Sequence, residues 1–299
     1  MKDNVKSYYP WLFLIVSLGL IFRTYNFAKS FSFAHDQDLY SWIAKDIIIN
    51  HHHRLIGQVT SINGVFIGSF YYYLMALFYQ LGGMNPLSAF FPLTLVGLFN
   101  IISVFIISKR HFGLKTGLIM GTIWSTAYGI AAYERWSVPT QLSYTWSIWF
   151  LGTALEIIRG NYKFLILAGF LLGFIWQIHI ALAPLTVLIL LSILGRKAKR
   201  PEKWFCLSLV VFLLSSLPLI AFEVKSNFSQ ARSFWKESKI RTGGPSGWQN
   251  AIKVIWASSK EIQTRFMFGS EIKQTEVLLS TLANDSVGPD SSLAKRTNR

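Results

Sequence analysis

Long apolar runs without an internal charge alternate with short polar or basic segments along the first 225 residues. Clear examples are 11–22, 91–107 and 205–222, and each approaches the roughly 20 residues that a helix needs to cross about 30 Å of hydrocarbon. A helix on the surface of a soluble protein would carry a polar stripe, which these runs lack. The pattern therefore predicts an all-α membrane protein.

Basic residues occur in clusters between the apolar runs, and these clusters set the topology. Lysine and arginine beside a span usually face the cytoplasm. Placing every cluster there predicts about seven transmembrane helices and a cytoplasmic N-terminus. Among these helices are spans at about 116–133 and 141–158 and two short helices within 164–194. The clusters are Lys2 with Lys6, Lys109-Arg110 with Lys115, Arg159 with Lys163, and Arg196, Lys197, Lys199, Arg200 and Lys203.

This topology implies a long first external loop, about 29–88. Counting its apolar part 64–83 as a span would put Lys109 and Arg110 outside, so we interpret it as a re-entrant or juxtamembrane helix. Its tyrosines, Tyr71-Tyr72-Tyr73, are then expected at interfacial depth, where their hydroxyls stay hydrated. The corner at Glu134-Arg135 and the tip at Gln177-Ile178-His179 are external too.

Composition agrees with lipid as the solvent, because 52% of the 299 residues are hydrophobic and 14% are charged. The formal charge of +15 lies in short clusters and not along one soluble face, so we expect no nucleic acid partner. No nucleotide-phosphate loop of either common glycine pattern occurs. We predict a transmembrane domain over 1–225 and an external polar segment with a disordered tail over 226–299.

The sharpest chemical pattern is His35-Asp36-Gln37-Asp38, just after the first span and before an amphipathic interfacial helix. Two carboxylates that flank one residue could share a divalent cation, or one could accept a proton that the other orients. Helix capping is the alternative, because an aspartate at a helix start satisfies free N–H groups.

Other polar residues lie within or next to predicted spans, where burying a polar side chain in hydrocarbon is energetically unfavourable. Arg23 in the outer part of the first span is expected either to be paired or to snorkel to the interface. Glu134 and Arg135 either pair with each other or supply a second acid and a phosphate-binding fork. Gln177 and His179 either bind substrate or make structural hydrogen bonds.

Two further patterns are weaker. Three consecutive histidines, His51-His52-His53, cannot all face one ion in a regular element. A basic run on the external side is either a solvated face or an attraction to anionic lipid or a lipid-linked phosphate. That run comprises Lys225, Arg232, Lys236, Lys239 and Arg241.

In order and position, these residues resemble the polytopic C-type glycosyltransferases (GT-C), the group that includes protein O-mannosyltransferases and the aminoarabinose transferase of lipid A. The resemblance covers about residues 8–225. It rests on Arg23, Asp36-Gln37-Asp38 with Tyr40, the Tyr-rich segment, 81–86, the basic turn 109–113, and the corner 134–139.

The resemblance implies a transferase in the plasma membrane that moves a sugar from a polyprenyl-phosphate donor to a glycan, lipid or protein acceptor on the outer face. Asp36 would be the catalytic acid, with Asp38 as second candidate and Glu134 beside them. The implied substrate or phosphate contacts are Arg23, Tyr40, Arg135, Gln177 and His179. A divalent cation, Mg or Mn, would bind at Asp36 and Asp38.

Members of this group usually continue through further spans, so a C-terminally truncated member is expected. Many members carry Asp-Glu where this chain has Asp-Gln-Asp, which leaves open which carboxylate is catalytic and whether a metal is used. Two other functions stay open: a transporter or flippase of lipid-linked glycans, and an inactive truncated paralogue. The enzyme is favoured because a flippase would need charges deep inside several spans. We expect Asp36, Glu134 and His179 to converge in one external cavity.

Overall fold

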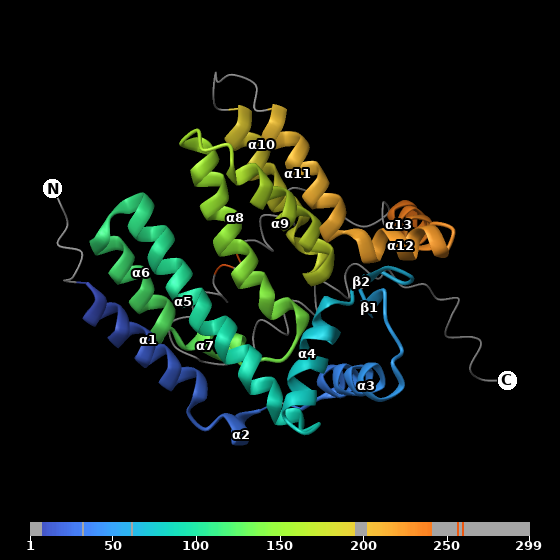
Figure 1. Ribbon diagram of the computed structural model, residues 1–299, viewed down its shortest axis with the longest axis horizontal. Coiled ribbons are helices and arrows are strands. Elements are labelled where there is room, and N and C mark those ends of the chain that lie inside the picture. Colours follow the sequence, from blue (N-terminus) through green and yellow to red (C-terminus); the bar gives the residue numbers. More distant parts are fainter. Residues whose placement is uncertain are drawn as a thin grey trace. The chain divides into compact units, whose positions relative to one another are not determined.

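The computed structural model describes residues 8–31, 33–60, 62–194 and 202–240, together with Trp256 and Ser259. Residues 1–234 form one compact unit and 235–299 another, and the elements around the site belong to the first. In these ranges the chain is almost entirely helical, with one two-stranded hairpin (Figure 1). The prediction of an all-α membrane protein is confirmed.

Among the described residues, two helical stretches are long and apolar enough to span a membrane. The first is Tyr9–Lys29, which contains α1 (Tyr9–Thr24) and the start of α2 (Phe27–Ser30). The second is Pro86–Phe112, which joins η1 (Pro86–Ala89) to α5 (Phe90–Phe112). A third becomes possible if α11 (Glu202–Ser215) and α12 (Leu217–Lys225), bent by 59°, are one broken span.

The remaining predicted spans are shorter or broken helices. The stretch 116–133 divides at Ala127 into α6 (Leu114–Thr126) and α7 (Tyr128–Glu134). Residues 141–158 correspond to η2 (Pro139–Gln141) and α8 (Leu142–Ile158). The stretch 164–194 folds as α9 (Phe164–Ile178), η3 (Ile180–Thr186) and α10 (Val187–Leu194), and Pro184 lies inside η3. Proline removes a backbone donor, which suits a break between two short helices.

A pair of glycines brings α9 and α11 into close contact. A methyl group on Gly169 would lie 2.1 Å from the Ser208 carbonyl oxygen, and one on Gly173 would lie 2.7 Å from that of Phe212. The spacing is the small-xxx-small pattern that lets membrane helices approach backbone to backbone. Packing of this kind is expected where lipid provides no hydrophobic drive between helices.

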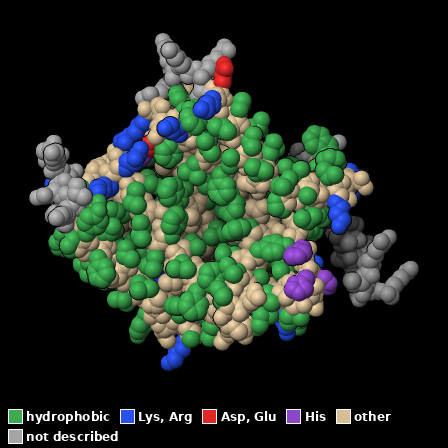
Figure 2. Space-filling model, in the orientation of Figure 1, with side chains coloured by type: hydrophobic (Ala, Val, Ile, Leu, Met, Phe, Trp, Pro, Cys, Tyr) green, Lys and Arg blue, Asp and Glu red, His purple; other side chains and the backbone are tan. Residues whose placement is uncertain are grey.

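The basic turns of the bundle lie together at one end. The Arg159 guanidinium donates to the carbonyl oxygens of Arg110 and His111 at 3.1 and 3.2 Å, which ties the turn after α8 to the end of α5. Figure 1 shows these turns at the opposite end of the bundle from α3 and the hairpin. Figure 2 shows Lys and Arg side chains gathered toward that end, with hydrophobic side chains covering much of the face below.

The first long loop contains α3 (His35–Asn50), the antiparallel strands β1 (Ile56–Val59) and β2 (Phe66–Gly68), and α4 (Phe70–Leu81). At 12 residues α4 is about 18 Å long, too short to cross the hydrocarbon. The prediction of hydrated tyrosines is wrong for two of the three, because Tyr71 and Tyr72 are buried in the core and only Tyr73 is exposed.

The polar segment after residue 225 is described in part. Helix α13 spans Ser229–Ile240. The predicted disordered tail, Arg241 and the Lys239 side chain lie outside the described residues, as do Lys2, Lys6 and the basic residues 196–200.

Candidate active site

Asp36 is a half-buried carboxylate held from one side by a strand. It lies in the first turn of α3, and the Gln58 side-chain amide on β1 donates to its Oδ1 at 3.0 Å. The other amide atom of Gln58, its Oε1, accepts from the Tyr40 hydroxyl. Tyr40, Gln58 and Asp36 thus form a chain of hydrogen bonds that fixes the carboxylate. Within the described residues its Oδ2 has no hydrogen-bond partner.

The direction of this chain follows from the state of the phenols. Burial raises the pKa of Tyr40 far above its usual value, and the nearby Asp36 charge raises it further. Burial likewise raises the pKa of Tyr72 to about 12. Tyr40 therefore keeps its proton and donates it to the Gln58 oxygen, which leaves the Gln58 NH₂ group to face Asp36.

Gln37, between the two aspartates, performs the capping that the sequence assigned to them. Its Oε1 accepts from the Ala34 backbone N–H at 3.0 Å, and its Nε2 donates to the Ser137 carbonyl at 3.1 Å. The Ser137 hydroxyl meets that of Tyr71 at 2.9 Å. The start of α3 is therefore docked on the corner that follows Glu134, and the aspartates need not cap.

Asp38 is exposed and does not accompany Asp36. Positions i and i+2 of a helix are about 200° apart and do not face each other, so the two carboxylates cannot chelate one ion together. Within the described residues no three His, Cys, Asp or Glu side chains form a metal-sized group. These residues do not fit a shared Mg or Mn site, and the chemistry proposed below uses none.

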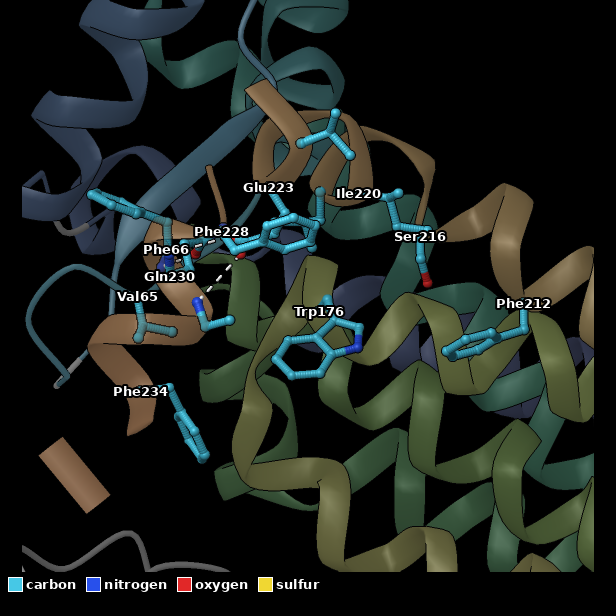
Figure 3. Close-up of a pocket in the computed structure, with 13 residues that line it drawn as sticks. Val65, Phe66, Trp176, Phe212, Ser216, Ile220, Glu223, Phe228, Gln230 and Phe234 are labelled. Carbon is cyan, nitrogen blue, oxygen red and sulfur yellow. Dashed lines mark hydrogen bonds between the residues drawn. The ribbon is translucent and has the colours of Figure 1, made fainter. Parts of the chain in front are cut away.

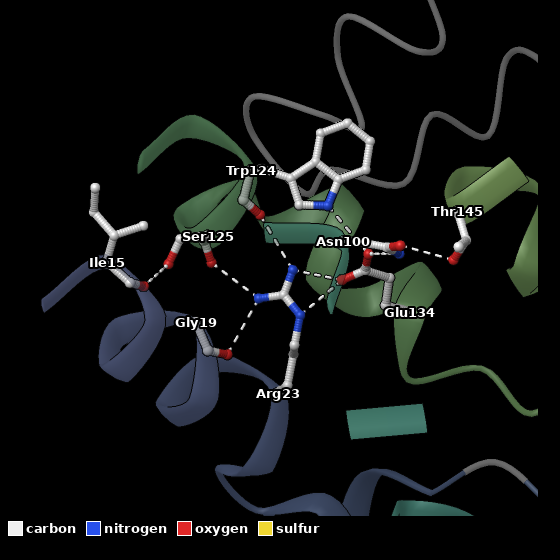
Figure 4. Close-up of polar contacts among 8 residues, drawn as sticks. All are labelled: Ile15, Gly19, Arg23, Asn100, Trp124, Ser125, Glu134 and Thr145. Atoms are coloured by element: carbon white, nitrogen blue, oxygen red, sulfur yellow. Dashed lines mark hydrogen bonds and ion pairs between the residues drawn. The ribbon is translucent and has the colours of Figure 1, made fainter. Parts of the chain in front are cut away.

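Glu134 and Arg23 form a closed, buried ion pair (Figure 4). Arg23 Nε donates to Glu134 Oε2 at 2.7 Å, and Arg23 Nη2 lies 2.5 Å from the same oxygen. The other guanidinium N–H groups donate to three backbone carbonyls, those of Gly19, Trp124 and Ser125. Arg23 is thus paired, as one sequence hypothesis expected, and it has no donor left for a phosphate.

The other carboxylate oxygen of Glu134, Oε1, also accepts hydrogen bonds. It accepts from Asn100 Nδ2 at 2.7 Å and from Trp124 Nε1 at 3.1 Å, and the Thr145 hydroxyl donates to Asn100 Oδ1 of the side-chain amide. The carboxylate pairs with Arg23 and not with its neighbour Arg135. The geometry gives Glu134 a structural role that joins α1, α5, α6 and α7.

Gln177 and His179 also make local structural bonds. Gln177 is buried, and its Oε1 accepts from the Phe70 N–H at 3.2 Å, at the start of α4. His179 Nδ1 accepts from the Ala181 N–H at 3.1 Å and so caps η3. Among the described residues, Asp36, Glu134 and His179 share no hydrogen bond or ion pair.

Arg135 is half-buried at the corner after α7. Its guanidinium carbon lies 5.6 Å from the centre of the Phe27 ring, and the side chain lines a groove of about 490 Å³. Of the five predicted substrate or phosphate contacts, Arg135 lines this groove, and the other four are not among its described lining residues.

A second cavity, of about 510 Å³, lies between the hairpin, α9, α12 and α13 (Figure 3). Its walls are apolar, with Trp176, Phe212 and Phe228 among them. Its one carboxylate, Glu223, accepts from the N–H groups of Gln230 and Ala231 at 3.2 and 3.3 Å and so caps α13. The cavity therefore contains a carboxylate whose negative charge would repel a phosphate.

The three histidines are exposed, and Figure 2 shows His side chains together at one edge of the face. Asp46 accepts from Asn50 at 2.8 Å and from Arg54 at 2.7 Å, and His52 Nδ1 lies 3.0 Å away. The hydrogen bond from Asn50 is the main cause that lowers the pKa of Asp46, followed by that from Arg54 and the nearby His52. These contacts connect the last turns of α3 with the segment just before β1.

Comparison with known proteins gives one match. A family model described as dolichyl-phosphate-mannose-protein mannosyltransferase matches residues 69–221, slightly more than half of the chain. No curated protein and no solved structure matches significantly. The matched range runs from α4 to α12 and includes the Glu134 corner, and Asp36 precedes it. The chain therefore belongs to the dolichyl-phosphate-mannose-protein mannosyltransferase family and is a membrane glycosyltransferase of the GT-C type.

Proposed function

We propose that this chain transfers a sugar from a polyprenyl-phosphate donor to a hydroxyl group of a cell-envelope acceptor, with Asp36 as the general base. The observation that carries the proposal is the Tyr40–Gln58–Asp36 chain, which holds one carboxylate oxygen and leaves the other without a partner among the described residues. A base needs this arrangement, because it must be oriented and still able to accept a proton.

In the proposed reaction, Asp36 Oδ2 takes the proton of the acceptor hydroxyl while the acceptor oxygen bonds to C1 of the sugar. The bond between C1 and the phosphate oxygen breaks, and the electron pair leaves on the lipid phosphate. A cation near that oxygen would stabilise the developing charge. We assign this role to Arg135, which lies two residues before Ser137 on the corner that contacts Gln37.

The placement of the site supports a reaction on the outer face of the membrane, which we take to be the plasma membrane. The basic turns at residues 109–115 and 159–163 lie at the opposite end of the bundle from α3 and the hairpin (Figure 1). By the positive-inside rule the basic end is cytoplasmic. The acceptor, whether glycan, lipid or protein, would then be met outside.

The decisive experiment compares Asp36→Asn with Asp38→Asn. Membranes containing each variant, at matched protein levels, are assayed for transfer of labelled sugar from polyprenyl-phosphate donors. Asparagine keeps the size of the side chain and removes the proton acceptor, so Asp36→Asn is expected to lower the rate by about 10²–10⁴-fold. Asp38→Asn is the matched control, because it removes the same charge from an exposed position one half-turn away.

Equal activity of Asp36→Asn and wild type would refute the assignment of the base. Loss of activity in Asp38→Asn alone would transfer the role to Asp38. A wild-type chain that moves lipid-linked glycan across vesicles without transferring sugar would favour the flippase.

A further inference from the structure

Strand β2 is held from outside the hairpin by two glutamines. Gln230, in the first turn of α13, is buried, and its Oε1 accepts from the Phe66 N–H at 2.6 Å (Figure 3). Gln177 Oε1 accepts from the Phe70 N–H at 3.2 Å, just after the strand. A methyl group on Gly68 would overlap the same Gln177 oxygen. Both ends of β2 are therefore fixed by side chains of other elements.

The hairpin needs this support because its own pairing is short and irregular. Its strands have four and three residues, and a two-stranded hairpin is only marginally stable by itself. The paired positions are Ile56 with Gly68 and Val59 with Phe66. Between these pairs, β1 contributes Gly57 and Gln58, whereas β2 contributes one residue. Two residues opposite one is the arrangement of a β-bulge.

The bulge brings Gln58 to the carboxylate. Bulges redirect side chains out of the regular alternation of a strand, and here Gln58 Nε2 donates to Asp36 Oδ1 at 3.0 Å. Asp36 is placed by a different support, because α3 is docked through Gln37 on the Ser137 carbonyl. The contact between Gln58 and Asp36 therefore depends on where the hairpin lies relative to α3.

Gln230 is in turn fixed by α12. The Glu223 carboxylate accepts from the backbone N–H groups of Gln230 and Ala231 at 3.2 and 3.3 Å, which secures the first turn of α13 (Figure 3). Gln230 also lies beyond the end of the range 69–221 that matches the family model. A series of contacts thus leads from α12 through α13 and the hairpin to the carboxylate.

We propose that Gln230 is a positioning residue for Asp36 and acts through the hairpin. Its bond to the Phe66 N–H holds β2 in place, and the bulge opposite that strand then sets Gln58 against the carboxylate. In this assignment Gln230 touches neither substrate nor a reacting atom. The inference rests on the proposed function and extends the support of the base from β1 to α13.

Steady-state kinetics of the full chain in phosphatidylcholine nanodiscs tests this role. Gln230→Met keeps the shape of the side chain and removes the acceptor, so kcat is expected to fall about three- to tenfold with little change in KM. Gln230→Glu keeps an acceptor oxygen at a helix start, where negative charge is favourable, and is expected to restore most of the rate. Gln80→Met makes the same substitution at an exposed position of α4 and is expected to match the wild type.

A double variant separates positioning from a general loss of structure. Gln58→Leu removes the donor to Asp36 and is expected to lower kcat by itself. If Gln230 acts through Gln58, adding Gln230→Met to Gln58→Leu is expected to cause no further loss. Losses that multiply in the double variant would mean that Gln230 acts elsewhere, and they would overturn the assignment.

Exchange of backbone amide hydrogens gives a readout that needs no turnover. In Gln230→Met, peptides that cover 56–68 are expected to exchange about three- to tenfold faster than in the wild type, with no change in Gln80→Met. Faster exchange with an unchanged kcat would overturn the positioning role. If the wild-type chain transfers no sugar, the proposed function alone fails: faster exchange in Gln230→Met would still support the link between α13 and the hairpin, and unchanged exchange would overturn it.

Discussion

Removing the Glu134 carboxylate tests whether this acid is structural or catalytic. In Glu134→Ala, the buried Arg23 guanidinium loses two contacts at 2.7 and 2.5 Å, and the donors of Asn100 and Trp124 lose their acceptor. Breaking a buried ion pair by removing one partner typically costs about 3–5 kcal/mol, because the remaining charge is uncompensated. We expect a loss of that size in the free energy of unfolding.

A double-mutant cycle isolates the pair. Arg23→Met alone is expected to destabilise through the orphaned carboxylate, whereas Arg23→Met with Glu134→Leu removes both charges and is expected to recover much of the loss. Unfolding in mixed micelles by a graded denaturing detergent, followed by tryptophan fluorescence, measures each free energy. Additive losses would mean that the two residues are not coupled and would refute the reasoning.

Activity separates the two roles of Glu134. A structural Glu134 predicts that any folded fraction of the double variant transfers sugar at nearly the wild-type rate. A double variant that is as stable as the wild type and yet inactive would make Glu134 a catalytic residue, as the sequence alone suggested.

Three further predictions concern other contacts. Tyr40→Phe keeps the ring and removes the donor that orients Gln58, so the rate constant of transfer should fall about three- to tenfold with little change in KM; steady-state kinetics checks this. Gly97→Ala would put a methyl group 2.6 Å from Arg23 Nε, and a lower midpoint of thermal unfolding is expected. Folding lowers the pKa of Asp46 below its ordinary value, chiefly through the hydrogen bond from Asn50. Its contacts therefore stabilise the fold above that ordinary pKa, and the gain is lost as the pH falls through the folded-state pKa. Asp46→Asn should therefore be less stable at pH 7 and less sensitive to acid below pH 4, as measured by unfolding across pH.

Hydropathy predicted the helical membrane fold because it depends on local composition, which the chain carries in every apolar run. The same argument located the breaks poorly. Ala127 carries no breaking signal, yet it divides one predicted span, so packing against neighbours decides where that helix stops. The bend at Ser216 does have a local signal, Pro218 in the first turn of α12, which an average of hydropathy does not register.

The sequence predicted those parts of the site that depend on residues adjacent in the chain. The acidic motif and its place at a helix start follow from the sequence, but the partner that holds Asp36 is Gln58, 22 residues away, in a strand that gave no chemical signal. Equally, a charge at Glu134 looks the same in the sequence whether it faces a substrate or Arg23, 111 positions earlier. Side-chain partners across such distances are set by tertiary packing.

The span of 111 residues between Arg23 and Glu134 has a consequence for the order of synthesis. At about 5–20 residues per second, α7 leaves the ribosome about 6–22 s after α1. During that time Arg23 must stay in the membrane without its carboxylate, which requires it to reach toward the interface or to remain beside the insertion machinery. The first helix of this protein is therefore expected to settle in its final place only when the seventh has been made.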